Sequence, residues 1–216
     1  MDLPLQLVNI VLHLDKYLDI VVQTYGFLTY AFLFLIIFCE TGLVIAPFLP
    51  GDSMIFAVGA LSAIGSLNVF VAWIIFLSAA ILGDTVNYWI GHYIGPRAYE
   101  LNHRLLSKKH LERAHGFYEK HGGKVIILAR FIPIIRTFAP FVAGVSKMNY
   151  SKFFLYNIIG ALLWTSIFIF AGYYFGNIPA VKKNFSYVII SIIFVSIIPI
   201  LVDILNNLRN RGKKVV

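Results

Sequence analysis

Long apolar runs separated by short polar stretches dominate the pattern along this chain of 216 residues. A helix that crosses a bilayer needs about 20 predominantly apolar residues. Four stretches reach or approach that length, and we expect each to span a membrane: Ile20–Cys39, Val69–Ile94, Phe153–Gly176 and Phe185–Val202. The pattern therefore predicts an all-α integral membrane protein.

Two further apolar segments are interrupted by turn residues and prolines. In the first, residues 40–65, the helical piece that follows Asp52 would be about 20 Å long, whereas the hydrocarbon core is about 30 Å thick. The second, residues 125–147, is expected to be broken by Pro133 and Pro140. We expect each segment to enter the bilayer and return to the same face, as a re-entrant helical hairpin.

Basic residues predict the orientation, because cytoplasmic loops carry an excess of lysine and arginine. The stretch 97–124 and the tail 203–216 are both basic, so both are expected on the cytoplasmic side. Two spans lie between them, so the second hairpin should enter from the cytoplasm and the first from outside. Residues 1–19 are expected to form an amphipathic helix at the cytoplasmic interface, which places both termini in the cytoplasm.

The two halves of the chain also share an internal repeat. "PFLPGDSMIFAVG" ends at Gly59 and is followed by "GHYIG", which begins at Gly91. "IPIIRTFAPFVAG" ends at Gly144 and is followed by "GYYFG", which begins at Gly172. Inverted repeats whose broken helices meet near the membrane midplane are common in secondary transporters. We therefore expect an inverted repeat built from two re-entrant hairpins plus transmembrane helices.

Composition supports a membrane protein and narrows its partners. Only 13% of the residues are charged and the mean hydropathy is +0.81, whereas soluble domains average about 25% charged residues. The net charge of +8 lies mostly between apolar segments, where it sets orientation and contacts anionic headgroups, so no nucleic-acid partner is expected. The single cysteine, Cys39, excludes an internal disulfide.

Acids and arginines inside the apolar segments are the candidate functional residues. An ionised side chain near the bilayer centre costs at least about 2.5–3.5 kcal/mol, so such groups pair or line a wet cavity. Glu40 and Asp52 flank the first hairpin, and Arg130 and Arg136 flank the turn of the second. If the hairpin tips meet, two acids face two bases.

These four charges allow two interpretations. They can be buried ion pairs that hold the hairpins together, or a site whose arginines bind an anion and whose acids gain and lose protons. Arginine suits the second role because its planar fork meets phosphate oxygens in a bidentate way. Poor hydration favours the protonated form of an acid, and a neighbouring arginine opposes it, so anion binding can be coupled to protonation.

Other residues in these segments are expected to support the site or the packing. Asp52 can also serve as the N-cap of the half-helix that follows it. Asp84, with Tyr88 four residues later, is expected to hydrogen-bond between helices rather than contact a ligand. The supporting residues are Pro50, Gly51, Asp84, Tyr88, Pro133, Pro140 and Gly144. The hairpins contain no histidine and no nucleophile beside a base, so we expect no enzyme activity, no cofactor and no metal.

Three stretches resemble the DedA family of membrane proteins, also called the SNARE-associated or VTT-domain family. They are "FCETGLVIAPFLPGDSMIFAVGAL", "GDTVNYWIGHYIG" and "FYEKHGGKVIILARFIPIIRTFAPFVAGVSKMNYSKF". The resemblance covers nearly the whole chain, so it implies a single membrane domain over residues 1–216 and a place in the bacterial cytoplasmic (inner) membrane. It also implies that Glu40 and Asp52 match the functional acids of the family, and Arg130 and Arg136 its functional arginines.

The resemblance implies transport of polyprenyl or phospholipid species between leaflets, with recycling of undecaprenyl phosphate and dependence on the proton motive force. We therefore expect a flippase for an anionic polyprenyl phosphate, coupled to protons or another cation. The alternatives are a structural or interaction protein, or a phospholipid scramblase, in which the four charges act as a lock. The sequence leaves the identity of the lipid and the oligomeric state open, a homo-oligomer included.

Overall fold

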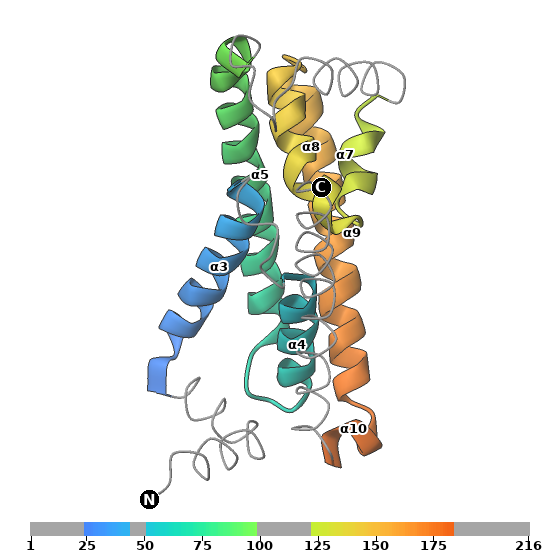
Figure 1. Cartoon of the computed structure of the whole chain (residues 1–216). Coiled ribbons are helices and arrows are strands. Elements are labelled where there is room, and N and C mark those ends of the chain that lie inside the picture. The colour runs from blue at the N-terminus through green and yellow to red at the C-terminus, as the bar shows by residue number, and fades with distance from the viewer. Residues whose placement is uncertain (1–23, 44–50, 99–121, 184–216) are drawn as a thin grey trace, which may run out of the picture. The chain divides into compact units, whose positions relative to one another are not determined.

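A computed structural model describes residues 24–43, 51–98 and 122–183, and all regular structure within them is helical (Figure 1). The helices are α3 (Phe27–Gly42), α4 (Gly51–Ala63), α5 (Val69–Ala98), α7 (Lys124–Ala129), α8 (Pro133–Val145), α9 (Tyr150–Gly176) and α10 (Pro179–Lys183). The expected N-terminal helix, most of the basic loop, the span 185–202 and the tail lie outside the described residues.

Among the described residues, two helices are long and apolar enough to cross a membrane, over Val69–Ile94 and Tyr150–Gly176. Both were predicted from the apolar pattern, although the second begins three residues earlier than expected. Asparagine caps explain where they start. The Asn68 Oδ1 accepts hydrogen bonds from the backbone N–H groups of residues 70 and 71, and the Asn149 Oδ1 accepts them from residues 151 and 152. Each cap satisfies two of the N–H groups that a helix start leaves without an intrahelical partner.

The predicted interruptions are present in both broken segments. The helix α4 ends at Ala63 after 13 residues, which corresponds to a length of about 20 Å, and a turn with Gly65 at φ +94° leads into α5. In the second segment, α7 ends at Ala129 and α8 begins at Pro133. Ile132 has an extended backbone, as a residue before proline prefers, so the helix cannot run through this point.

One detail of the prediction is wrong, because Pro140 lies inside α8 without ending it. A proline in a helix interior removes one i→i−4 hydrogen bond and bends the helix. Here the turn keeps its helical form because α8 is held by close packing on α5. The helix ends later, at Val145, where Lys147 has φ +53° and the Met148 N–H donates to the carbonyl of Ala143.

The described residues fall into two compact units. One contains residues 24–29, 51–72 and 168–183, and the other contains residues 30–43, 73–98 and 122–167. The helices α5 and α9 contribute to both units. Each unit is described by itself below.

Glycines set the helix packing in the first unit, where α4 lies against the end of α9. A Cβ atom at Gly59 would clash with the carbonyl oxygen of Ile169, and one at Gly172 would clash with the carbonyl oxygen of Phe56. Each glycine therefore faces the carbonyl of the residue three positions before its partner glycine. Backbones can approach this closely only where no side chain separates them.

The second unit repeats this contact between α8 and α5. A Cβ atom at Gly144 would clash with the carbonyl oxygen of Tyr88, and one at Gly91 would clash with the carbonyl oxygen of Phe141. The spacing of three residues is the same as in the first unit. The four contact glycines are those at which the two halves of the sequence align. In each unit, the glycine contact joins a half-helix to the long helix of the other half of the repeat.

These contacts predict the effect of adding one methyl group. Gly59→Ala and Gly144→Ala should each destabilise the protein by about 1–3 kcal/mol, because backbone atoms would have to move to relieve the clash. Thermal unfolding in detergent measures the change. Gly42→Ala is the control, since its Cβ would lie 3.3 Å from the carbonyl oxygen of Gly83, and it should cost less. Equal losses in all three variants would contradict the packing described here.

Candidate functional site

A buried ion pair joins the end of α3 to the start of α8 in the second unit. The Arg136 guanidinium donates a hydrogen bond from Nη2 to Oε1 of Glu40. The Glu40 side chain is fully buried, and Arg136 is 8% exposed. The Arg136 Cζ lies 5.2 Å from the ring centroid of Trp164 on α9, within the range of a cation–π interaction. The pair therefore occupies a site with little access to water.

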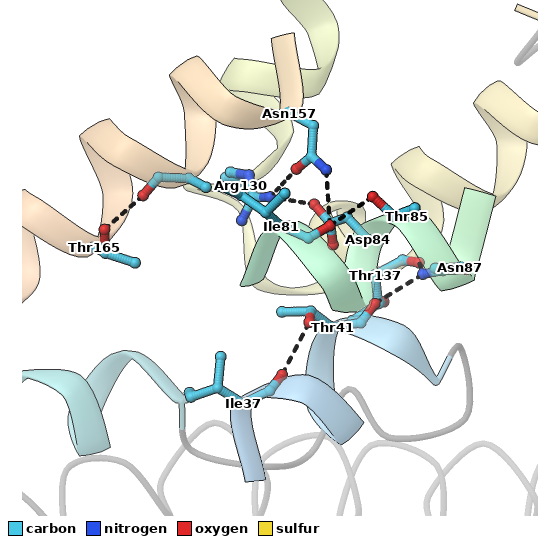
Figure 2. Close-up of polar contacts among 11 residues, drawn as sticks. Ile37, Thr41, Ile81, Asp84, Thr85, Asn87, Arg130, Thr137, Asn157 and Thr165 are labelled. Carbon is cyan, nitrogen blue, oxygen red and sulfur yellow. Dashed lines mark hydrogen bonds and ion pairs between the residues drawn. The ribbon is translucent and has the colours of Figure 1, made fainter. Parts of the chain in front are cut away.

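A second buried ion pair lies at the break between α7 and α8. Arg130, the C-cap residue of α7, donates from Nη2 to Oδ2 of Asp84 on α5 and to Oδ1 of Asn157 on α9 (Figure 2). The Asn157 Nδ2 donates in turn to the Ile81 carbonyl, over 3.1 Å. Gly160 on α9 makes room for the arginine, because a Cβ there would lie 3.0 Å from its Cδ. This network ties α5, α7 and α9 together around one charge.

A buried amide lies beside both pairs. Asn87, one turn after Asp84 on α5, is fully buried. Its Nδ2 donates to the backbone carbonyls of Thr41 and Thr137 (Figure 2). Thr41 ends α3 together with Gly42, and Thr137 lies in the first half of α8. Asn87 thus connects the two helices whose charged residues form the first ion pair.

The structure places three of the four charged residues proposed from the sequence in buried ion pairs. Glu40 meets Arg136, but the acid that meets Arg130 is Asp84. Asp84 reaches it because α5 runs alongside the α7–α8 break. Asp52 lies in the first turn of α4, in the other unit, so the structure does not place it relative to the two pairs.

The supporting residues that the structure describes have structural roles. Tyr88 is buried, donates its hydroxyl to the Met148 carbonyl and stacks on Phe153 with ring centroids 4.5 Å apart. Gly144 gives the close contact with α5, Pro133 starts α8, and Gly51 is buried at the start of α4. Pro140 lies within α8, and Pro50 falls outside the described residues.

Sequence reasoning assigned Trp164 to interface anchoring and packing, and placed neither this residue nor Asn87 or Asn157 in the site. A signal existed for Asn157, which interrupts the apolar run "FFLYNIIGALLW". A buried amide without partners is costly, so an asparagine in an apolar span must find hydrogen-bond partners inside the protein. Within the part of the chain that the structure describes, no three histidine, cysteine, aspartate or glutamate side chains are placed to hold a metal ion.

Comparison with known proteins supplies the family. Residues 49–174 match the model of the VTT domain. The chain is 51% identical to Protein DedA of Escherichia coli K12 over 212 residues. This alignment covers 97% of each of the two chains. The chain belongs to the DedA family. The sequence resemblance is thereby confirmed.

Less similar relatives from the DedA family are named as membrane proteins. An uncharacterized membrane protein of Mycobacterium leprae is 40% identical over 82% of this chain and 80% of its own. Inner membrane protein YqjA of Escherichia coli K12 is 38% identical over 71% of this chain and 70% of its own. No solved structure matches. Together with the two apolar helices, these relatives show that this chain is a membrane protein.

Removal of one partner of a buried pair should be more harmful than removal of both. Asp84→Asn leaves Arg130 as a buried cation without its anion, so we expect a loss of about 3–5 kcal/mol. The double variant Asp84→Asn with Arg130→Gln should be more stable than this single variant. Thermal unfolding in detergent tests both.

Thr85→Val is the matched control on the same turn of α5. It removes only a local hydrogen bond from the Thr85 hydroxyl to the Ile81 carbonyl and should cost less than Asp84→Asn. If the losses in stability caused by Asp84→Asn and Arg130→Gln simply add, the two side chains do not compensate each other and the pair contributes no interaction energy.

Proposed function

We propose that this protein is a lipid transporter that moves an anionic polyprenyl phosphate, such as undecaprenyl phosphate, from the outer to the inner leaflet of the bacterial cytoplasmic membrane. Transport is coupled to protons or to another cation. The observation that carries the proposal is the buried pair of Glu40 and Arg136 at a broken helix of a membrane protein.

An arginine in this position suits an anionic headgroup. The guanidinium already donates a charge-assisted hydrogen bond to a carboxylate, and the same fork can donate to phosphate oxygens. Non-helical backbone at membrane depth is tolerated chiefly where it lines a cavity or is buried in protein. The break at residues 130–132 places such backbone directly beside Arg130. We propose Arg130 and Arg136 as the substrate-binding residues.

Proton coupling follows from competition for the arginine. While Glu40 holds Arg136, its carboxylate is compensated and stays ionised. When a phosphate takes the arginine, the acid loses its partner in a poorly hydrated site, which favours its protonated form. Lipid binding and proton uptake are then linked, and linkage is reciprocal. We propose Glu40 and Asp52 as the proton-coupling residues.

The proposed architecture is an inverted repeat in one VTT domain. Its two broken segments, residues 40–65 and 125–147, would enter the membrane from opposite faces as re-entrant hairpins, with both termini in the cytoplasm. The repeated glycine contact supports the repeat, since Gly59 with Gly172 and Gly144 with Gly91 follow one spacing. Repeats of this kind let one half rock against the other around a central site.

A structural role for the charges is the second candidate, and the burial of both ion pairs favours it. In that case Glu40, Asp84 and their arginines only lock the helices, and the protein acts as an interaction partner or a phospholipid scramblase. Enzyme activity stays outside the proposal, because the hairpin segments carry no nucleophile beside a base.

Arg136→Lys separates the two candidates. It keeps the charge but loses the planar fork, so the loss of one charge-assisted hydrogen bond to phosphate should slow transport about tenfold or more. Purified protein in liposomes with labelled undecaprenyl phosphate measures the rate, and labelled phospholipid in parallel vesicles tests the scramblase. Lys152→Arg, an exposed change on α9, should transport normally. If a folded Arg136→Lys variant transports at the wild-type rate, bidentate binding of phosphate by Arg136 is contradicted.

Glu40→Gln and Asp52→Asn test the coupling. Both are nearly isosteric but cannot titrate, so at least one should still bind lipid phosphate while its transport no longer responds to an imposed pH gradient. Liposomes with and without a gradient measure the response. Retention of the full gradient dependence by both variants would show that the acids only brace the helices and that the proton moves elsewhere.

A further inference from the structure

Asn87 on α5 makes two hydrogen bonds, and both go to other helices. Its Nδ2 lies 3.0 Å from the carbonyl oxygen of Thr41 and 2.8 Å from that of Thr137 (Figure 2). Thr41 directly follows Glu40, and Thr137 directly follows Arg136. The amide therefore holds the backbone on both sides of the first ion pair.

The two carbonyls are accessible for separate physical reasons. Thr41 lies in the last turn of α3, where carbonyl groups lack the usual intrahelical partner. Thr137 lies in the turn of α8 that contains Pro140, where the proline has no N–H for the carbonyl of Arg136 and its ring bends the helix. The Asn87 amide thus meets one carbonyl at a helix end and one in a turn that an internal proline bends. The close contacts of Gly83 with Thr41 and Gly42 bring α3 near enough to α5 for Asn87 to reach it.

The orientation of the amide shows that donation is its role. Both acceptors are carbonyl oxygens, so a flipped amide would place Oδ1 against them and is excluded by the hydrogen-bond network. In the orientation observed, Oδ1 has no hydrogen-bond partner among the described residues. A fully buried side chain that leaves its acceptor unsatisfied while it uses its amino group twice is placed for those two donations.

We propose that Asn87 is a positioning residue that keeps Glu40 and Arg136 in register. It acts through the backbone, since each of its bonds fixes the residue that follows one member of the pair. The importance of Asn87 for transport rests on the proposed function. When a headgroup binds Arg136 and Glu40 is released, the two Asn87 hydrogen bonds hold α3 and α8 in place, so that the same ion pair can form again.

Asn157 provides a matched control in the same unit. It is also a fully buried asparagine, but it bonds Arg130 and the Ile81 carbonyl and so serves the second ion pair. If each asparagine positions its own ion pair, an Asn87 variant should weaken the first pair and an Asn157 variant should weaken the second. A general loosening of the helices would affect both pairs alike.

The test measures the coupling within each pair by double-mutant cycles, in three backgrounds of the full-length protein in detergent. Glu40→Gln with Arg136→Gln reports the first pair, and Asp84→Asn with Arg130→Gln reports the second. The readout is the non-additive part of the shift in Tm. In the Asn87→Leu background the first coupling should fall by roughly half or more, and the second should be retained. In the Asn157→Leu background the reverse is expected.

Two results would overturn the proposal. Asn87→Leu could lower Tm while the coupling of Glu40 to Arg136 stays at its wild-type value, or both asparagine variants could weaken both couplings equally. Asn87→Ala, which is smaller, serves if the leucine variant does not fold. The couplings do not depend on transport, so a negative flipping assay would contradict the proposed function while leaving this inference intact.

Discussion

An ionised side chain buried away from water must be compensated where it lies, because desolvation costs more than a distant or poorly oriented charge returns. The second unit meets that constraint with two ion pairs. Glu40 and Arg136 compensate each other across α3 and α8, and Asp84 compensates Arg130 across α5 and the α7–α8 break. The uncharged partners, Asn157 and Trp164, bring α9 into contact with the same two arginines.

Such pairs are stable only if the backbone holds them at hydrogen-bond distance, and small residues make that possible. Gly42 and Gly83 let α3 approach α5, and Gly91 and Gly144 let α8 approach it. Gly160 leaves space for the Arg130 side chain. A larger residue at any of these positions would push apart elements that carry the paired charges or would take the space of the Arg130 side chain. In this unit, the charge pairing therefore depends on the close helix packing.

The same arrangement suits a protein whose charges must change partners. A buried arginine that donates a charge-assisted hydrogen bond to a carboxylate can donate in the same way to a phosphate. The helix break at residues 130–132 places irregular backbone beside one of the arginines. In the mechanism proposed above, Asn87 holds the backbone at Thr41 and Thr137 while the charged groups exchange partners.

The sequence by itself determined the two long helices, the short α4 and the break before Pro133, because these depend on local properties: apolar length, capping asparagines and the restricted backbone of prolines and their neighbours. It also determined which charges lie within apolar segments and, through the glycine repeat, which backbone positions must pack closely. Only the tertiary structure decided the partners. Asp84 meets Arg130, Pro140 stays within α8, and Asn87 and Asn157 become part of the site. These outcomes depend on which helices lie side by side, and a hydrogen bond between residues 46 or more positions apart leaves no periodic trace in the chain.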